Sequence, residues 1–179
     1  MTGVQTCALP IYARHFPAIQ WLDSYSEYLS DLSAWYSENV DKRFMHFRAE
    51  FLYILNQESA LMEIVKLIGS DVLPDEQKLI LDISRVIRVG FLQQNAFHSE
   101  DTYVPLIKQF KMMEIILYLY EKAKLLVSIG IPMSVLNADG IWNRIINIKY
   151  DVPNNKLELF DNYKQDIDRF YSSISEKHA

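Results

Sequence analysis

Residues 105–127 read PLIKQFKMMEIILYLYEKAKLLV, and the spacing of their apolar side chains predicts one long α-helix. Apolar residues recur at steps of three and four, which places them on one face of a helix. The residues of this stripe are Leu106, Phe110, Met113, Leu117 and Tyr120. Gly130 and Pro132 follow the segment and end it.

Apolar residues at steps of three and four also occur in two segments nearer the N-terminus. Residues 44–68 predict one long helix, or two with a break near Asn56, and Gly69 ends it because glycine readily adopts the positive φ of a helix terminus. Pro74 is suited to the start of a further helix, whose apolar face runs to about Gly90.

Three other segments complete the pattern. Residues 141–148 predict a short helix, and residues 160–174 predict a longer one with a regular apolar face. The aromatic side chains of residues 21–36 share one helical face, and Asp23 or Ser24 could cap that helix. We expect this aromatic face to pack into the core rather than to line a ligand pocket.

The composition agrees with a helical domain. The chain has 179 residues, of which 50% are hydrophobic, so it has the size of one ordinary domain and enough apolar material for a core. Five glycines and six prolines are too few for a turn-rich β-sandwich. The sequence therefore predicts an all-α fold, a helical bundle of five to seven helices.

The charge pattern bears on partners and location. The net charge is −5, and no stripe of basic residues appears, so nucleic-acid binding has no electrostatic support. The most apolar stretch, residues 115–120, is far shorter than a membrane span. The N-terminal residues also lack the pattern of a signal peptide. We expect a cytoplasmic protein that does not insert into the membrane.

Residues 1–11 (MTGVQTCALPI) are treated separately from the domain. They resemble the translation of a common sequencing adapter, so we hypothesise an artefact fused to a truncated gene; the alternative is an ordinary disordered tail. The helical domain then spans residues 12–179. The only cysteine, Cys7, lies in the first segment, so no disulfide or cysteine-based metal site is expected in the domain.

Motifs for independent chemistry are missing from the sequence. It has no GxxxxGK(S/T), GxGxxG or GxSxG motif, and its histidines lack the spacing of a zinc-binding helix. His98 beside Glu100 and Asp101 could suggest a metal cluster. We interpret these residues instead as a helix start that Ser99, Asp101 or Thr102 caps, with His98 facing solvent. No catalytic residue and no metal site is therefore predicted.

Three stretches resemble sequence blocks of the A subunits of V-type ATPases. Residues 14–22 (RHFPAIQWL) and 24–26 (SYS) are similar to the family signature RHFPAIxWLxSYS. Residues 56–73 (NQESALMEIVKLIGSDVL) are similar to its helix before a Gly-Asx-x-Leu turn. Residues 91–106 (FLQQNAFHSEDTYVPL), followed by KQ at 108–109, resemble the long FLQQNAF block. The matches run in family order, although Val104 stands where many members have cysteine.

This resemblance implies that residues 12–179 are the C-terminal helical domain of the catalytic A subunit of a rotary ATPase or ATP synthase that translocates protons or sodium ions. The P-loop, the glutamate that activates water and the Mg²⁺ ligands would lie in other parts of that protein, and an arginine finger would come from the B subunit. ATP or ADP with Mg is thus the implied cofactor of the full-length protein, and none is expected for the fragment alone. The implied partners are the central stalk subunits and the B subunit, in a head peripheral to the membrane.

The resemblance also places Gln94, Asn95, Ala96 and Phe97 at the adenine side of the nucleotide pocket. An aromatic ring on a loop offers a stacking face for a purine. We assign that face to Phe97, close approach to Ala96, and polar contacts to Asn95 or Gln94. The alternative is that Phe97 is a core anchor that pins the loop.

The resemblance also implies that residues 70–78 (SDVLPDEQK) occupy the place where rotary catalytic subunits contact the central stalk. Asp71, Asp75 and Glu76 would face a basic stalk surface, and closure around nucleotide would push that surface. The alternative is that the acids in the first helical turn only favour the helix dipole.

The fragment alone should neither bind ATP measurably nor hydrolyse it. One stacked base contributes about 1–3 kcal/mol, whereas millimolar affinity needs about 4 kcal/mol. Two alternatives stay open from the sequence. The chain could come from another rotary subunit, such as the B subunit or an F-type β subunit, or it could be a stand-alone helical protein-interaction module with its own start near Tyr12.

Overall fold

The computed structural model describes residues 17–24 and 26–178, and within these ranges it contains helices and turns but no β-strand. The α-helices in chain order are α2 (Leu29–Asn39), α3 (Phe44–Ile68), α4 (Asp75–Arg85), α5 (Ser99–Thr102), α6 (Leu106–Ser128), α7 (Met133–Leu136), α8 (Ile141–Ile146), α9 (Ile148–Asp151) and α10 (Phe160–His178). A π-helix, η1 (Val86–Leu92), and a 3-10 helix, η2 (Leu157–Leu159), complete the described elements. The prediction of an all-α bundle is confirmed.

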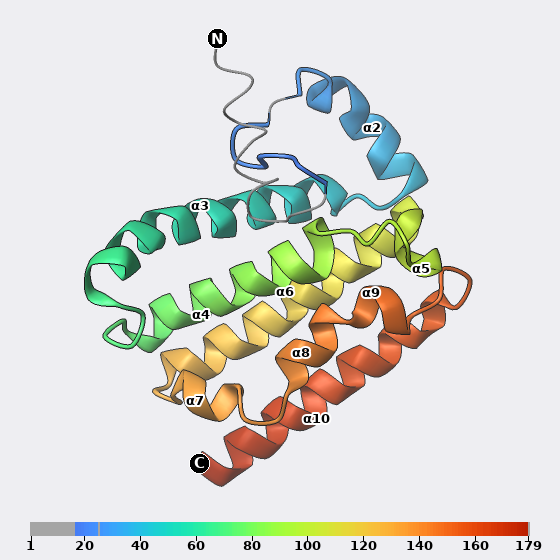
Figure 1. Cartoon of the computed structure of the whole chain (residues 1–179). Helices are drawn as coiled ribbons and strands as arrows, with labels where there is room; N and C mark the ends of the chain where they lie inside the picture. The colour runs from blue at the N-terminus through green and yellow to red at the C-terminus, as the bar shows by residue number, and fades with distance from the viewer. Residues whose placement is uncertain (1–16, 25, 179) are drawn as a thin grey trace.

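Helix α6 forms the centre of the bundle, because it packs against α3, α4 and α10 (Figure 1). Its predicted stripe is largely buried, but so are side chains on its other faces. These additional buried residues include Ile115, Ile116 and Leu119. A helix that is apolar on several faces is typically surrounded by other helices, and this is the position that α6 occupies.

The structure shows where the two helices predicted before and after Gly69 begin and end. Residues 44–68 form one helix without a break at Asn56, and Gly69 ends it with a φ of 84°. The next helix follows directly on Pro74, as predicted. It does not end at Gly90, however, because the helical path continues as η1 through Leu92.

The N-terminal helix differs from its prediction. It begins at Leu29 rather than near Asp23, and residues 21–23 form a turn before it. Leu32 and Trp35 of the predicted stripe are exposed, whereas Tyr36 beside them is partly buried and stacks on Phe44 at 4.5 Å between ring centres. The expected core packing of this stripe is therefore wrong for the structure. Tyr25, which belongs to the predicted stripe, lies outside the described residues, as do residues 1–11.

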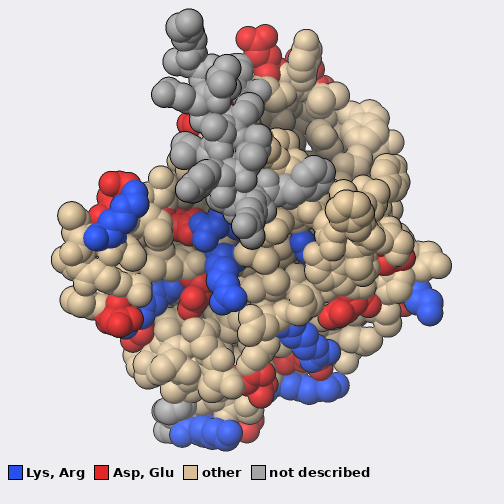
Figure 2. All heavy atoms as spheres, in the orientation of Figure 1, with Lys and Arg blue, Asp and Glu red and all other residues tan. Residues whose placement is uncertain are grey.

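The surface mixes charges of both signs. In the view of Figure 2, Lys and Arg side chains alternate with Asp and Glu side chains over the lower half of the molecule. None of the helices in the described ranges combines the length and the apolar character that crossing a membrane requires. The described residues also contain no group of His, Cys, Asp and Glu that could hold a metal ion.

Candidate functional site

The connection from η1 to α6, residues 93–105, forms a polar loop that includes the short helix α5. We call it the 93–105 loop. In Figure 1 its helix α5 lies at the opposite end of the molecule from the α3–α4 turn. The four residues predicted to contact adenine are consecutive in this loop, so the structure keeps them together, whereas residues 70–78 form a separate group.

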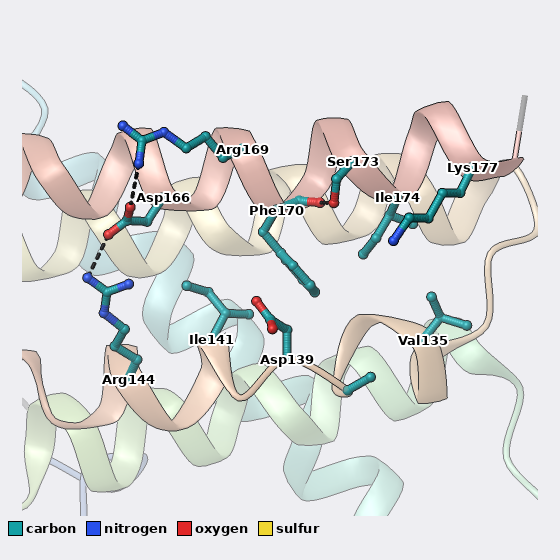
Figure 3. Close-up of a pocket in the computed structure, with 11 residues that line it drawn as sticks. Val135, Asp139, Ile141, Arg144, Asp166, Arg169, Phe170, Ser173, Ile174 and Lys177 are labelled. Carbon is teal, nitrogen blue, oxygen red and sulfur yellow. Dashed lines mark hydrogen bonds and ion pairs between the residues drawn. The ribbon is translucent and has the colours of Figure 1, made fainter.

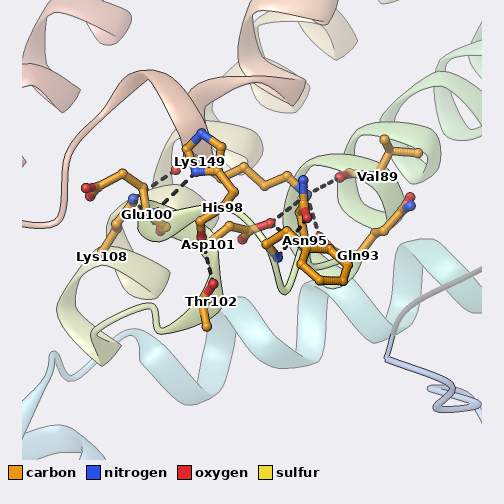
Figure 4. A network of polar contacts seen from close by, with 10 residues as sticks. Val89, Gln93, Asn95, His98, Glu100, Asp101, Thr102, Lys108 and Lys149 are labelled. Carbon is orange, nitrogen blue, oxygen red and sulfur yellow. Dashed lines mark hydrogen bonds and ion pairs between the residues drawn. The ribbon is translucent and has the colours of Figure 1, made fainter.

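Hydrogen bonds within the loop fix its main chain. The Asp101 carboxylate accepts a 2.6 Å hydrogen bond from the Asn95 amide, and the Asn95 side-chain oxygen accepts a 3.0 Å bond from the Phe97 amide. The Thr102 hydroxyl lies 2.9 Å from the Ala96 carbonyl and 2.8 Å from the His98 carbonyl. The loop therefore has a defined conformation set by side chains on both of its halves (Figure 4).

Lys149, on α9, lies beneath the loop with only 2% of its surface exposed. Its ammonium group donates a 2.9 Å hydrogen bond to the Val89 carbonyl, donates another to the Gln93 carbonyl, and lies 3.5 Å from the Asp101 carboxylate. Burial lowers the pKa of Lys149, and Asp101 opposes that shift because a nearby anion favours the charged ammonium. This one cation thus contacts both the first residue of the loop and Asp101 in α5.

A second buried lysine, Lys108 on α6, is 0% exposed. Its ammonium group donates to the Lys149 carbonyl at 2.9 Å, to the Asn154 side-chain oxygen at 2.8 Å and to the Glu100 carbonyl at 3.3 Å. The Asn154 amide in turn donates a 2.6 Å bond to the Glu100 carboxylate. Burial lowers the pKa of Lys108, and the carboxylates of Glu100 and Asp101 oppose this shift.

This network leaves the tip of the loop exposed. The Phe97 side chain is fully exposed, with a relative surface of 101%, and Asn95 and Ala96 are exposed beside it. Gln94 is half-buried. The alternative that Phe97 is a core anchor is therefore wrong for this structure. Phe91 fills that role instead, because its ring packs edge-on against Phe51 at 5.3 Å.

His98 corrects a detail of the sequence prediction. Its own Nδ1 accepts a 3.3 Å hydrogen bond from the Glu100 amide and so caps α5. The imidazole is partly buried and lies 4.6 Å from the ring of Tyr150, measured between ring centres. The prediction that His98 faces solvent is therefore wrong, and so is the prediction that Ser99, Asp101 or Thr102 caps the helix, although a helix does start at Ser99.

The sequence analysis did not identify the two buried lysines. Lys108 shares a helical face with Met112 and Ile115, and Lys149 lies one turn after Ile145, so each occupies an apolar face. A lysine on an apolar face is the available signal, because lysine is rarely buried without partners. Neither position could be linked to the loop without the fold.

The predicted stalk-contact residues surround the start of α4. Asp75 is only partly exposed, and its carboxylate accepts a 3.3 Å hydrogen bond from the Met133 amide. Asp71 and Glu76 are exposed. Leu67, at the end of α3, and Val72, in the α3–α4 turn, are 85% and 69% exposed, so acidic and apolar side chains share this end of the molecule.

A groove between α10 and the α7–α8 segment is a third feature of the surface (Figure 3). Asp166 lies at its edge, paired with Arg144 at 2.6 Å and with Arg169 at 3.5 Å. Phe170 and Ile141 supply apolar walls. The Arg144–Asp166 pair joins α8 to α10, whereas the Arg169–Asp166 pair lies within α10, which indicates a structural role for this part of the groove.

Comparison with known proteins identifies what this chain resembles. A family model described as the C-terminal domain of V and A type ATP synthase matches residues 33–134, a segment that includes the 93–105 loop and the α3–α4 turn. The V-type ATP synthase alpha chain 2 of Clostridium tetani is 46% identical over 167 residues, which are 93% of this chain and 28% of the relative.

Two further relatives give the same picture. The V-type ATP synthase alpha chain of Halothermothrix orenii is 44% identical over 166 residues, covering 93% of this chain and 28% of the relative. The A subunit of the A-type ATP synthase of Methanopyrus kandleri is 41% identical over 165 residues, covering 92% of this chain and 28% of the relative. The chain thus spans less than a third of the length of these curated relatives.

Proposed function

Because the chain belongs to the family of C-terminal domains of V- and A-type ATP synthases, we propose that it is the C-terminal helical domain of the catalytic A subunit of a rotary ATPase or ATP synthase. There it contributes the adenine side of the nucleotide pocket and a contact with the central stalk. The full-length protein works with stalk subunits and a B subunit in a cytoplasmic head peripheral to the membrane, and the complex translocates protons or sodium ions.

One observation carries the adenine role: Phe97 is fully exposed on a loop whose main chain is held by internal hydrogen bonds. An exposed aromatic ring on a fixed loop costs little entropy to stack against a planar base. Asn95 and Ala96 beside it offer a polar contact and room for close approach. Residues 94–97 therefore fit the adenine base of ATP or ADP, while the groups that hold phosphate and Mg²⁺ belong to other parts of the full-length protein.

The test uses a chimeric protein, in which residues 12–179 replace the corresponding segment of a full-length relative within its assembled complex. We expect Phe97→Ala to raise the KM for ATP roughly 5- to 150-fold, the equivalent of one lost base stack. Phe97→Trp should keep the KM close to that of the parent chimera, since it preserves a stacking face.

The matched control is Tyr53→Ala, which removes another exposed aromatic side chain, on α3 and outside the loop. It should leave the KM unchanged. An unaltered KM in the Phe97→Ala chimera, with the complex assembled normally, would refute the adenine role.

The stalk contact is supported by the mixture of exposed acidic and apolar side chains at the α3–α4 turn. Asp71 and Glu76 are the appropriate positions to reverse, because their carboxylates are exposed. Asp75 is less suitable, since its carboxylate also holds the Met133 amide. In the chimeric complex, Asp71→Lys with Glu76→Lys should weaken the coupling between ATP hydrolysis and stalk rotation. Unchanged torque in single-molecule rotation would contradict this contact.

A further inference from the structure

We infer that Lys149 is a positioning residue for nucleotide recognition, because its buried ammonium group ties Gln93, at the start of the 93–105 loop, and Asp101, in α5, to α9 and so sets the place of Phe97. This inference rests on the proposed adenine contact of Phe97. Lys149 itself contacts no nucleotide in this proposal. It acts through the loop.

The three N–H groups of the Lys149 ammonium match three acceptors. Two are the carbonyls of Val89 and Gln93, at the C-terminal end of η1. Carbonyls at a helix end lack partners within the helix and carry its negative dipole, so a cation there satisfies them. The third acceptor is the Asp101 carboxylate, on the far side of the loop. A lysine has three donors and no acceptor, so the group is fully used.

The connection from this ammonium to Phe97 is continuous. Asp101 pairs with Lys149 through Oδ2, and the same oxygen accepts from the Asn95 amide at 2.6 Å. The Asn95 side chain then accepts from the Phe97 amide at 3.0 Å. Lys149 holds Asp101, Asp101 holds Asn95, and Asn95 holds the Phe97 amide. Loss of the Lys149 ammonium group would therefore loosen the main chain at Phe97.

Lys108 supports the arrangement from α6. Its 2.9 Å bond to the Lys149 carbonyl holds α9 in place, and its bonds to Glu100 and Asn154 hold the other side of α5. Two buried ammonium groups are costly to desolvate, and apolar residues often replace such groups without loss of stability. We therefore assign to Lys108 and Lys149 the role of fixing the conformation of the loop, rather than that of stabilising the fold.

The experiment compares Lys149→Met with Lys149→Arg in the chimeric complex. Methionine keeps the length of the side chain but removes the donor from the Val89 and Gln93 carbonyls and the cation from Asp101, so the KM for ATP should rise about tenfold with kcat changed less than about twofold. Arginine keeps the charge and several donors, and it should restore the KM to within about threefold of the parent. Lys122→Met is the control, because it removes a partly exposed lysine away from the loop, which pairs with Asp168 at 2.8 Å between α6 and α10.

A double variant separates positioning from a general loss of structure. If Lys149 acts through Phe97, then Lys149→Met should raise the KM less than about twofold when Phe97→Ala is already present. Independent, multiplicative effects of the two substitutions would overturn the inference. An equal fall in kcat and kcat/KM with an unchanged KM would overturn it as well.

Hydrogen exchange on the 179-residue chain tests the loop without any nucleotide. Lys149→Met should speed exchange of the Asn95, Phe97 and His98 amides and leave the amides of α10 protected. If Lys149→Met does not fold, the combined Lys149→Met and Asp101→Asn variant removes both buried charges, and the same predictions apply to it. Unchanged exchange together with an unchanged KM would refute the positioning role.

The two proposals fail in different ways. If Phe97→Ala leaves the KM unaltered, the adenine contact fails, and the inference about nucleotide recognition fails with it. If Phe97→Ala raises the KM while Lys149→Met alters neither the KM nor the exchange, the adenine contact stands and only the positioning role of Lys149 is wrong.

Discussion

The main chain at Gly90 lies directly against the main chain at Ile146, so that a Cβ atom at position 90 would fall 3.1 Å from the Ile146 Cα atom. This contact joins η1 to α8, immediately before the 93–105 loop. The same Cβ atom would also lie 3.4 Å from the Ile146 carbonyl oxygen. Glycine at position 90 lets the main chains of η1 and α8 approach this closely, whereas any other residue would require one of them to move.

We expect Gly90→Ala to lower the free energy of unfolding of the chain by about 1–3 kcal/mol, because the added methyl group meets main-chain atoms that cannot move independently. In an open helical site the same change would stabilise by about 0.5–1 kcal/mol. The sign of the change, measured by urea unfolding, therefore decides whether the backbone contact exists. A gain in stability would contradict the packing of η1 on α8.

Phe97 and Phe91 should differ sharply in their effect on stability. Phe97→Ala should change the free energy of unfolding by less than about 0.5 kcal/mol, because the side chain is fully exposed. Phe91→Ala should cost about 1–3 kcal/mol, because its ring packs against Phe51. Urea unfolding of both variants tests the assignment. A comparable loss for the two would mean that Phe97 is anchored in the structure after all.

Glu114 joins three helical segments through charge. Its carboxylate pairs with Arg43 at 2.9 Å, at the start of α3, and with Lys164 at 3.1 Å on α10. Burial alone would raise the pKa of the Glu114 carboxyl, but Lys164 and Arg43 together hold that pKa below its ordinary value of 4.5. The native state therefore favours the ionised carboxylate more strongly than the unfolded chain does.

Glu114→Gln should lower the free energy of unfolding by about 1–3 kcal/mol at pH 7. A folded pKa below the unfolded pKa contributes stability that is complete above the unfolded value and is lost as the pH falls through the folded value. The difference between the parent chain and the variant should therefore narrow below pH 4.5. Urea unfolding at pH 7 and at several acidic pH values measures this difference in the free energy of unfolding.

Glu63→Gln provides the control for that experiment, because the Glu63–Lys66 pair is exposed on α3. Removal of an exposed pair should change stability by less than about 1 kcal/mol. A Glu114→Gln effect that stayed constant from pH 7 into the acid range would disagree with the lowered pKa.

The isolated chain should not act on ATP. One base stack contributes about 1–3 kcal/mol, less than the roughly 4 kcal/mol that millimolar binding requires. Titration calorimetry with Mg-ATP should therefore give no measurable heat of binding below about 1 mM, and a phosphate-release assay should show no turnover. Hydrolysis by a pure preparation would mean that the chain holds phosphate-binding groups of its own.

Periodicity predicted most of the helices correctly because each helix is a local structure. The steps of three and four residues located α3, α6 and α10, and Gly69 marked the end of α3. The same reasoning was wrong for the residues before Leu29, where residues 21–23 form a turn instead of a helix. The helical path of α4 and η1 ends at Leu92, two residues past the end predicted at about Gly90. Glycine is common at helix ends, but Gly90 lies inside η1 at a close backbone contact with Ile146.

By itself, the sequence determined the all-α class, the positions of the long helices and the polar QNAF segment between two of them, since these follow from patterns of neighbouring residues. Only the tertiary structure decided what holds that segment. Lys108 and Lys149 are 41 residues apart, and Lys149 reaches back 60 residues to the Val89 carbonyl. No local period encodes such contacts, because they form only when α6, α9 and η1 pack together and exclude water from the two ammonium groups.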